Sequence, residues 1–522
     1  MTPAFTAPEI PWAALAPVLF VLGAGVLGVL VETVVPGRLR RAFHLGLVLL
    51  GTGGALVASA LLWRDVSATG GRAVLNGSMI IDGPTVVLQA ILAALGLVSL
   101  LVIADRDAAE EDAFAPTASA VPGSEYEELA RRRGLTQGEV FPLAFFALGG
   151  MMIFPAAGDL LTLFIALEVL SLPLYLLASM ARRRRLLSQE AGLKYFLLGA
   201  FASAFLLFGI ALLYGFSGSL RLSEIAVAVT AVTGLDPLLL TGAGLVLVGL
   251  LFKVGAFPFH AWTPDVYQGA PTPITGFMAA CTKIAAFGIM LRFVYVVLPP
   301  LEWDLMPALI AVAVLTMLLG SVVAIVQTDI KRMLAYSSIA HAGFVLTGVL
   351  GAAQVVPAGQ ATSASGVMFY LTAYGFATIG AFAIVTMVRN AAGEENSIAG
   401  WTGLARKNPW VAGLMSLFML SFAGIPLTGG FIGKWAVFTS AWRGGYGWLV
   451  VVAVLASLLA VYFYLRLVVV MFSGTPAKGM YVGSATAWTW IPVVVGVVAT
   501  LWLGIVPDQA MQLATFAGGF LR

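Results

Sequence analysis

Ionisable side chains interrupt several of the most apolar stretches of this sequence. A charged side chain at the middle of a bilayer costs between about 3 and more than about 10 kcal/mol, so such residues seldom serve packing alone. Carboxylate, amine and imidazole groups in an apolar medium all favour their neutral forms, which brings proton exchange toward neutral pH. Their alternation along the chain indicates a proton relay. The candidate relay residues are Glu168, Lys194, Lys253, His260, Lys283, His341 and Lys434.

The stretch 249–283 gathers three of these residues around an interrupted helix. It begins as an apolar helix that carries Lys253, and the glycine and proline of VGAFPF then interrupt it. Glycine and proline break the regular hydrogen bonding of a helix, which leaves backbone groups open to water. His260 lies at this break, and a second apolar helix carries Lys283. We therefore expect proton transfer to be organised around this stretch.

A purely structural role is the alternative for each candidate. Glu168 lies at mid-depth of its span, where neither membrane surface is within reach, so a functional role is favoured for it. Lys194 lies near the inner end of its helix, and extension of its side chain to the membrane surface is a serious alternative. The same extension is expected of Arg292 and Arg466. His341 fits a buried core histidine equally well.

The composition identifies the class of protein that must hold these groups. Of 522 residues, 60% are hydrophobic and 10% are charged, whereas soluble domains carry about 25% charged residues. Repeated long apolar runs predict an all-α polytopic membrane protein, because helices satisfy the backbone of such runs in lipid. We predict about 14 transmembrane helices. Their spans are 13–34, 43–63, 84–103, 141–155, 159–180, 191–215, 238–268, 272–297, 305–326, 329–350, 365–389, 409–441, 447–472 and 486–507.

Arginine and lysine are distributed unequally between the loops, which predicts the orientation of the spans. With the N-terminus outside, the cytoplasmic loops hold most of the basic residues, and both termini face the outer, periplasmic side. The basic residues expected inside are Arg38, Arg40, Arg41, Arg106, Arg131 to Arg133, Arg182 to Arg185, Lys331, Arg332, Arg389, Arg406, Lys407 and Lys478. Those expected outside are Arg64, Arg72, Arg221, Arg443 and Arg522.

The chain offers little for a redox or metal centre. Cys281 is its only cysteine, which excludes an iron–sulfur cluster and a CxxC redox pair on this chain. No P-loop, HExxH motif or metal-spaced group of cysteine and histidine is present. GAGVLG at 23–28 matches the dinucleotide pattern GxGxxG, but it lies inside an apolar run without a preceding strand, so close helix packing is the better interpretation. We expect no flavin, nucleotide, metal or other cofactor on this chain.

Two of the predicted spans are broken, and they indicate an internal repeat. The breaks lie at VGAFPF and at GIPLTGG, and each has a lysine near it, Lys253 or Lys434. Each broken span is the fourth of a five-helix unit, spans 4–8 and spans 9–13. An odd number of helices reverses the second unit relative to the first, which is the inverted-repeat plan of secondary transporters. The predicted parts are a three-helix segment 1–103, a cytoplasmic loop 104–140, the repeats 141–297 and 305–472, and a C-terminal helix within 473–522.

Three motifs carry a resemblance to a known family. They are LFKVGAFPFHAWTPDVYQGAPTP, Glu168 within LFIALEVLSLPLYLL, and QTDIKRMLAYSSIAHAGF. With them the chain resembles, over nearly its whole length, the antiporter-like membrane subunits of respiratory complex I. That group includes Mrp-type cation/proton antiporters and membrane-bound hydrogenases. An M-type subunit would have a glutamate at the position of Lys434, and an L-type subunit would continue into a long lateral helix; neither feature is expected here.

The resemblance implies roles for the candidate residues in proton translocation. Glu168 matches the family's glutamate on the fifth span, and Lys253 matches the lysine on the broken seventh span. Lys283 and Lys434 match the lysines on the eighth span and on the broken twelfth span. Lys194 matches a sixth-span lysine that bridges toward the glutamate. The two histidines of the relay are further candidates.

The resemblance also implies where the chain works and with what. NADH, FMN, iron–sulfur clusters and quinone would be bound by partner subunits, whose redox chemistry would drive protons through this subunit of a proton-translocating NADH:quinone oxidoreductase. The expected partners are other antiporter-like and small membrane subunits, the peripheral redox arm and membrane lipids, with no nucleic acid. The composition points to the plasma membrane of a bacterium. Two alternatives stay open: a subunit of a Mrp-type antiporter or membrane-bound hydrogenase, and a structural scaffold whose charges are vestigial.

Overall fold

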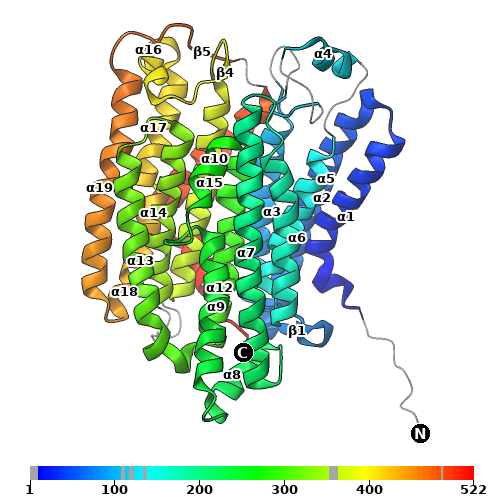
Figure 1. Cartoon of the computed structure of the whole chain (residues 1–522), viewed down its shortest axis with the longest axis vertical. Helices are drawn as coiled ribbons and strands as arrows, with labels where there is room; N and C mark the ends of the chain where they lie inside the picture. Colours follow the sequence, from blue (N-terminus) through cyan, green and yellow to red (C-terminus); the bar gives the residue numbers. More distant parts are fainter. Residues whose placement is uncertain are drawn as a thin grey trace.

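Long helices make up almost the whole molecule. The computed structural model describes residues 10–106, 112–116, 123–132, 138–351, 362–483 and 486–521. The helices run side by side along the long axis of the molecule (Figure 1). Within the described residues, 12 helices are long and apolar enough to cross a membrane, which confirms the predicted all-α polytopic membrane fold. Their bounds are α1 (Trp12–Val34), α2 (Gly37–Thr69), α3 (Gly83–Ile103), α6 (Leu160–Ala178), α7 (Arg185–Ser217), α9 (Asp236–Val254), α11 to α12 (Thr272–Val296), α13 (Glu302–Ile325), α14 (Ile330–Leu350), α15 (Ser363–Met387), α19 (Gly447–Phe472) and α20 (Ala487–Ile505).

Shorter helices lie at the other predicted spans. α5 (Val140–Ile153) lies where the sequence predicts the fourth span. α10 (Trp262–Gly269) follows α9 after the predicted break in the seventh span, and α17 (Pro409–Ala423) and α18 (Gly429–Arg443) together form the broken twelfth. The count of fourteen crossings stays a prediction, because α5 and α17 are shorter than a full crossing requires.

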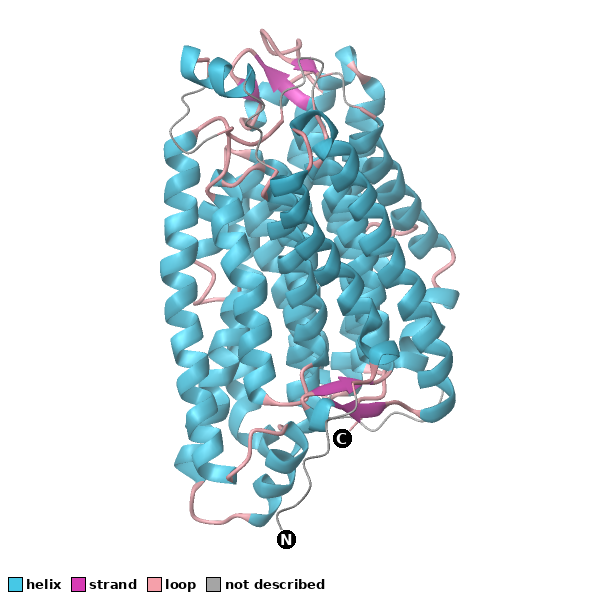
Figure 2. Ribbon diagram, turned by 90° about the vertical axis from the view of Figure 1, so that its right-hand side faces the viewer, coloured by secondary structure: helices cyan, strands magenta, loops and turns pink. Residues whose placement is uncertain are grey.

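Two small antiparallel sheets and several short helices cap the ends of the bundle (Figure 2). The first two strands pair with each other, and the third lies between the fourth and the fifth at the opposite end of the molecule. The strands are β1 (Arg72–Val74), β2 (Met79–Ile81), β3 (Val388–Asn390), β4 (Gly393–Glu394) and β5 (Tyr481–Val482). The short helices at the ends are α4 (Glu125–Arg132), α8 (Leu222–Ala231), α16 (Leu404–Lys407) and α21 (Asp508–Ala517).

Aspartate caps begin the equivalent helices of the two predicted repeats. Asp159 accepts a hydrogen bond from the backbone N–H of Thr162 (2.6 Å) at the start of α6, and Asp329 accepts one from that of Arg332 (3.0 Å) at the start of α14. Such caps satisfy N–H groups that have no partner within the helix. α6 begins at the end of the bundle where α8 lies, and α14 begins at the end where α16 lies (Figure 1). This reversal is what an inverted repeat requires, and the repeat itself stays a prediction.

Three long helices form the interior of the bundle, and the others surround them. In its most apolar 18-residue window, Thr272–Val296 is 100% buried, and α14 and α15 are 94% and 89% buried. The corresponding share for α7 and for α19 is 33%. The helices that carry Lys283 and His341 are therefore enclosed by other helices of this chain, while α7 and α19 offer apolar surface to lipid or to neighbouring membrane proteins.

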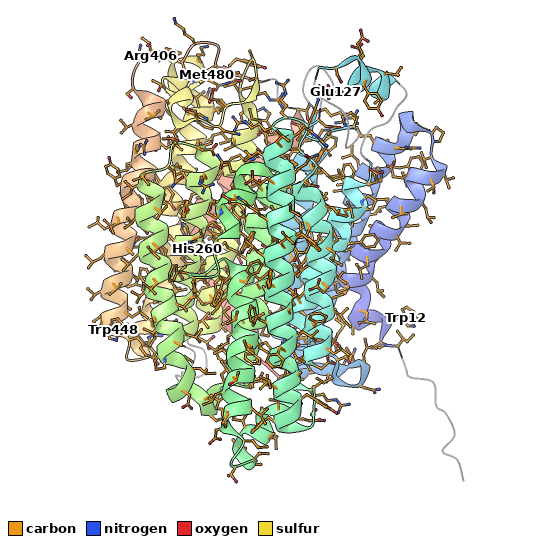
Figure 3. All side chains as sticks on the ribbon, viewed as in Figure 1. Trp12, Glu127, His260, Arg406, Trp448 and Met480 are labelled. Carbon is orange, nitrogen blue, oxygen red and sulfur yellow. The ribbon has the colours of Figure 1, made fainter. Side chains whose placement is uncertain are left out.

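Both ends of the described chain lie at the same end of the bundle (Figure 1). Trp12 and Trp448 lie near that end, and Arg406 and Glu127 lie near the opposite one (Figure 3). Both tryptophans are more than half exposed, as is usual for tryptophan at a membrane–water interface. The arrangement agrees with a topology in which both termini face one side, and the identity of that side stays a prediction.

Two of the three glycines of GAGVLG, Gly25 and Gly28, have a packing role. A Cβ atom at Gly25 would lie 3.1 Å from the ring of Phe146, and one at Gly28 would lie 3.1 Å from Pro142. These glycines therefore let α1 approach α5 closely, as their interpretation as packing residues predicts.

The predicted cytoplasmic loop 104–140 is partly described. Residues 107–111, 117–122 and 133–137 lie outside the described residues. The carboxylate of Glu127 on α4 lies 2.6 Å from Nε of Arg182, and both side chains are almost fully buried. Glu127 therefore does not lie on a solvated face, and it joins α4 to the arginine-rich segment before α7.

Arg292 is buried, so the expectation that it extends to the membrane surface is wrong. Its guanidinium forms a bidentate pair with Asp82, with N–O distances of 2.8 and 2.9 Å. It also donates to Thr85 Oγ1 and to the carbonyl oxygen of Pro155. Both charged side chains are at most 1% exposed. This pair joins the start of α3 to the last turns of α12.

We expect Asp82→Asn to destabilise the folded chain by about 3–5 kcal/mol, because it leaves the guanidinium of Arg292 buried without a counter-charge. Asp65→Asn is the matched control, since Asp65 and Arg72 are about half exposed and lie 3.8 Å apart. An exposed pair of this kind contributes about 0–1 kcal/mol. Thermal unfolding in detergent measures both effects, and equal melting temperatures for the two variants would contradict a stabilising role for the buried pair.

Candidate functional site

Lys253 lies at the end of the first half of the broken seventh span. α9 ends at Val254, where Gly255 adopts a φ of 75°, a conformation that glycine reaches without steric cost. Lys253 is 2% exposed. Its Nζ donates to Ser171 Oγ on α6 at 2.9 Å and to the Tyr195 hydroxyl on α7 at 3.1 Å. Two neutral hydroxyl groups therefore hold the amine.

Aromatic packing fixes Tyr195 beside Lys253. The ring of Tyr195 stacks on Trp262 of α10, with ring centroids 4.6 Å apart and 10° between the planes. Trp262 Nε1 in turn donates to the carbonyl oxygen of Phe252 in the last turn of α9 at 2.9 Å. Both halves of the broken helix thus position the hydroxyl that contacts the Lys253 amine.

Glu168 lies one turn before Ser171 on α6. Its Oε1 accepts a hydrogen bond from Ser203 Oγ on α7 at 2.5 Å, and the side chain is half-buried between these two helices. No ion pair of the described residues joins Glu168 to Lys253 directly, but Ser171, one turn further along α6, binds the Lys253 amine. The predicted coupling of the two residues therefore depends on charge acting at a distance and on Ser171.

Lys283 follows a wide, π-helical turn, Met278–Thr282, between α11 and α12. Turns of this kind occur frequently at functional sites. The side chain is 3% exposed, and its Nζ donates to the carbonyl oxygen of Val254 at 2.9 Å and to that of Ser338 at 2.6 Å. It connects the break after α9 with the middle of α14.

His341 lies deep in the interior, one turn after Ser338 on α14. It is 3% exposed, with Nδ1 2.5 Å from the hydroxyl of Tyr370 and Nε2 3.1 Å from that of Tyr464. The imidazole therefore has a hydroxyl partner on each nitrogen.

Lys434 contacts the break of the second broken span. α17 ends at Ala423, where Gly424 has a φ of 83°. The Nζ of Lys434, on the helix after the break, donates to the carbonyl oxygens of Phe422 and Ala423 at 2.9 Å each and to Ser457 Oγ at 2.8 Å. The lysine thus binds backbone oxygens that the break leaves without helical partners.

Four of the predicted site residues form a row through the interior. Lys283 binds Val254, which is the neighbour of Lys253, and it also binds α14, which carries His341. The imidazole of His341 packs against the ring of Phe422, with centroids 5.6 Å apart, and the carbonyl oxygen of Phe422 accepts the hydrogen bond from Lys434. The row is Lys253, Lys283, His341 and Lys434, and Glu168 stands beside its first member.

Lys194 is not part of this row, and its predicted bridge toward Glu168 is wrong. Its Nζ lies 2.6 Å from Glu190 and 2.7 Å from Asp265, and the side chain is 42% exposed. The partner in the i−4 position is a local one. Asp265, on α10, is a partner that the sequence analysis does not single out.

His260 also lies apart from the row. It is half-exposed at the break between α9 and α10, near mid-height of the bundle (Figure 3). Its ring lies 5.5 Å from that of Phe257, and Nδ1 has no hydrogen-bond partner among the residues that the structure describes. No side-chain hydrogen bond among the described residues connects it to the row.

The residues that complete the site are mostly tyrosines. Tyr195, Tyr370 and Tyr464 supply the hydroxyl partners of Lys253 and His341. Nothing in their spacing along the sequence marks them. The described residues contain no group of three or more His, Cys, Asp and Glu side chains that could hold a metal ion.

Comparison with known proteins identifies the family. A family model described as NADH:quinone oxidoreductase/Mrp antiporter, TM, matches residues 157–460, more than half of the chain. A relative from Beutenbergia cavernae, named NADH-quinone oxidoreductase subunit N, is 56% identical over 99% of this chain and 99% of its own length. The chain belongs to the subunit N family of NADH-quinone oxidoreductases. The resemblance to antiporter-like subunits of complex I is thereby confirmed.

Two solved structures contain chains similar to this one over nearly its whole length. A chain in the structure of respiratory complex I from Thermus thermophilus with bound aureothin has a TM-score of 0.76 at 33% identity, over 96% of this chain and 100% of that chain. A chain of the Mrp complex from Dietzia sp. has a TM-score of 0.77 at 22% identity, over 98% of this chain and 97% of that chain. The second likeness shows a shared fold.

Proposed function

We propose that this chain moves protons across the membrane as subunit N of a NADH-quinone oxidoreductase, driven by redox chemistry in other subunits. The observation that carries the proposal is the row of buried ionisable groups that runs between the two broken helices. Burying ionisable side chains inside a membrane protein costs much free energy, so their presence there indicates a proton route. The names of the relatives indicate the complex in which this proton route operates.

Each lysine of the row can exchange its proton because neutral oxygens hold its amine. Hydroxyl and carbonyl groups stabilise an ammonium less than a carboxylate would. A buried amine that they hold therefore loses its proton more readily than one paired with a carboxylate. Tyrosine hydroxyls can both donate and accept hydrogen bonds. The tyrosines on the two sides of His341 therefore extend a hydrogen-bonded path on either side of the imidazole.

The two broken helices serve opposite sides of the membrane in this proposal. Lys253, with Glu168 beside it, takes up a proton from the cytoplasmic side, and Lys434 releases one to the outer side. The repeats 141–297 and 305–472 supply one half-route each, flanked by the segments 1–103, 104–140 and 473–522. The membrane is the plasma membrane of a bacterium, and both termini face the periplasm, as the distribution of basic residues supports.

The redox chemistry lies outside this chain in the proposal. NADH, FMN, iron–sulfur clusters and quinone belong to partner subunits, and this chain holds no redox centre. Its single cysteine, Cys281, is buried and supports that division. The partners are neighbouring antiporter-like and small membrane subunits and, through them, the peripheral arm.

Function as part of a cation/proton antiporter is the main alternative. The likeness to the Mrp chain supports it only as far as the fold. A scaffold with vestigial charges is the second alternative, and charge-neutral substitutions that leave pumping intact would favour it.

Purification of the native complex through a tag on this chain tests the proposal. We expect flavin and iron–sulfur subunits to co-purify, and NADH oxidation by the vesicle-bound complex to drive proton uptake. We expect the chain purified alone to show no NADH oxidation or quinone reduction. Co-purification of antiporter subunits without redox subunits, or turnover by the isolated chain comparable to that of the complex, would contradict the proposal.

A further inference from the structure

Asp265 holds two cations that come from different parts of the chain. Its Oδ2 lies 2.7 Å from Nζ of Lys194 on α7, and its Oδ1 lies 2.6 Å from Nη1 of Arg332 at the start of α14. α7 belongs to the first predicted repeat and α14 to the second. Asp265 is also the only charged residue of α10. Its carboxylate therefore links this short helix ionically to α7 of the first predicted repeat and to α14 of the second.

α10 connects this ion pair to the row. One turn before Asp265, the helix carries Trp262, which stacks on Tyr195. Tyr195 follows Lys194 on α7, and its hydroxyl binds the amine of Lys253. The faces of α7 and α10 thus meet at two adjacent contacts, one ionic and one aromatic, and the aromatic contact positions a direct partner of the buried lysine.

The fit between α7 and α10 leaves little room for movement. At the far end of α10, a Cβ atom at Gly269 would lie 2.6 Å from Cβ of Ala191 and 2.5 Å from the carbonyl oxygen of Leu187. Glycine allows this close approach. A displacement of α10 would therefore be transmitted to Trp262 rather than absorbed by loose packing.

The two broken helices carry opposite charges at corresponding places. Asp265 and Lys434 lie equally far along the chain from Gly255 and Gly424, the glycines that end α9 and α17. Lys434 contacts its own break directly, whereas Asp265 reaches outward to Lys194 and to the second repeat. The carboxylate of Asp265 thus takes part in a contact between the two predicted repeats.

We propose that Asp265 is a positioning residue for proton transfer at Lys253. Its carboxylate holds α10 so that Trp262 keeps the hydroxyl of Tyr195 against the amine of Lys253. Its bond to Arg332 ties this geometry to the position of α14 and so to the second repeat. The inference rests on the proposed proton-translocating function.

The test compares Asp265→Asn, Asp265→Glu and Glu224→Gln in the intact complex, reconstituted in vesicles. Glu224 is the matched control, because it is an exposed carboxylate on α8, 2.9 Å from Arg221 and outside the row. Asp265→Asn should lower redox-driven proton uptake between about 10-fold and 100-fold, since small displacements at a reacting group have effects of that size. It should also shift the pH profile of pumping, because the partner of the Lys253 amine moves. Asp265→Glu should restore most of the uptake, and Glu224→Gln should pump normally.

Pumping and a pH profile in Asp265→Asn equal to those of the wild type would overturn the inference. A loss without any shift of the pH profile, or an equal loss in Asp265→Glu, would also overturn it in favour of a merely structural role. If Asp265→Asn does not assemble on native gels, Arg332→Gln tests the same link from α14, and normal pumping there overturns the inference. Lys253→Met distinguishes a failure of this inference from a failure of the proposed function. Normal pumping in that variant contradicts the proposed function itself.

Discussion

Replacing Lys253 with methionine is expected to abolish most redox-driven proton pumping while the complex still assembles. Methionine keeps the length of the side chain and removes the amine, so the proton carrier at the first broken helix is lost while the packing persists. Glu168→Gln should have a similar effect, because it removes the carboxylate one turn from Ser171, which binds this amine. We expect each single change to lower pumping at least about tenfold, as loss of a positioned proton-transfer group costs about 10²–10⁴-fold in enzymes.

The double variant of Glu168 and Lys253 tests whether the two residues act as one unit. Residues of one network are non-additive, so the double change should cost little more than either single change. Proton uptake into vesicles measures pumping, and native gels check assembly. Lys478→Met is the matched control, because Lys478 is an exposed loop lysine. Additive losses, or near-normal pumping in Glu168→Gln, would show that the two residues work separately.

Lys434→Met is expected to impair proton release through the second half of the chain to a comparable extent. Lys434→Arg should rescue poorly for two reasons. An arginine hardly gives up its proton, and its planar fork does not fit the three oxygens that the single Nζ of Lys434 binds. The same vesicle assay applies, with NADH turnover recorded in parallel to separate pumping from redox activity. An arginine variant that pumps as well as the wild type would indicate a fixed charge at this position instead of a proton carrier.

The sequence predicts the broken helices and the lysines beside them because those signals are local. Glycine and proline within an apolar run indicate where a helix ends. A lysine within the same run stands out because burying its charge costs free energy. Gly255 and Gly424 end their helices where the sequence predicts, and Lys253 and Lys434 lie at those breaks. The buried position of Lys283 and His341 is one that their apolar surroundings in the sequence already indicate.

The partners of these residues could not be predicted, since they come from distant parts of the chain. Arg292 and Asp82 are 210 positions apart, so the sequence supports surface extension for Arg292 as well as burial. For Lys194, the local carboxylate of Glu190 is visible in the sequence, but the carboxylate of Asp265 is close only because α10 folds back against α7. His260 lies at the break as predicted, yet it is half-exposed there and its ring contacts Phe257.

The wide turn at Met278–Thr282 sets the direction in which Lys283 points. An α-helix has about 3.6 residues per turn, so one residue inserted into a turn rotates everything after it by about 100°. A regular helix through the same residues would aim the amine of Lys283 at a different neighbour, away from Val254 and Ser338. The turn thus rotates the part of the helix that follows it relative to the part that precedes it. Without this turn, Lys283 would no longer connect the break after α9 with the middle of α14, although no charge of the chain would change.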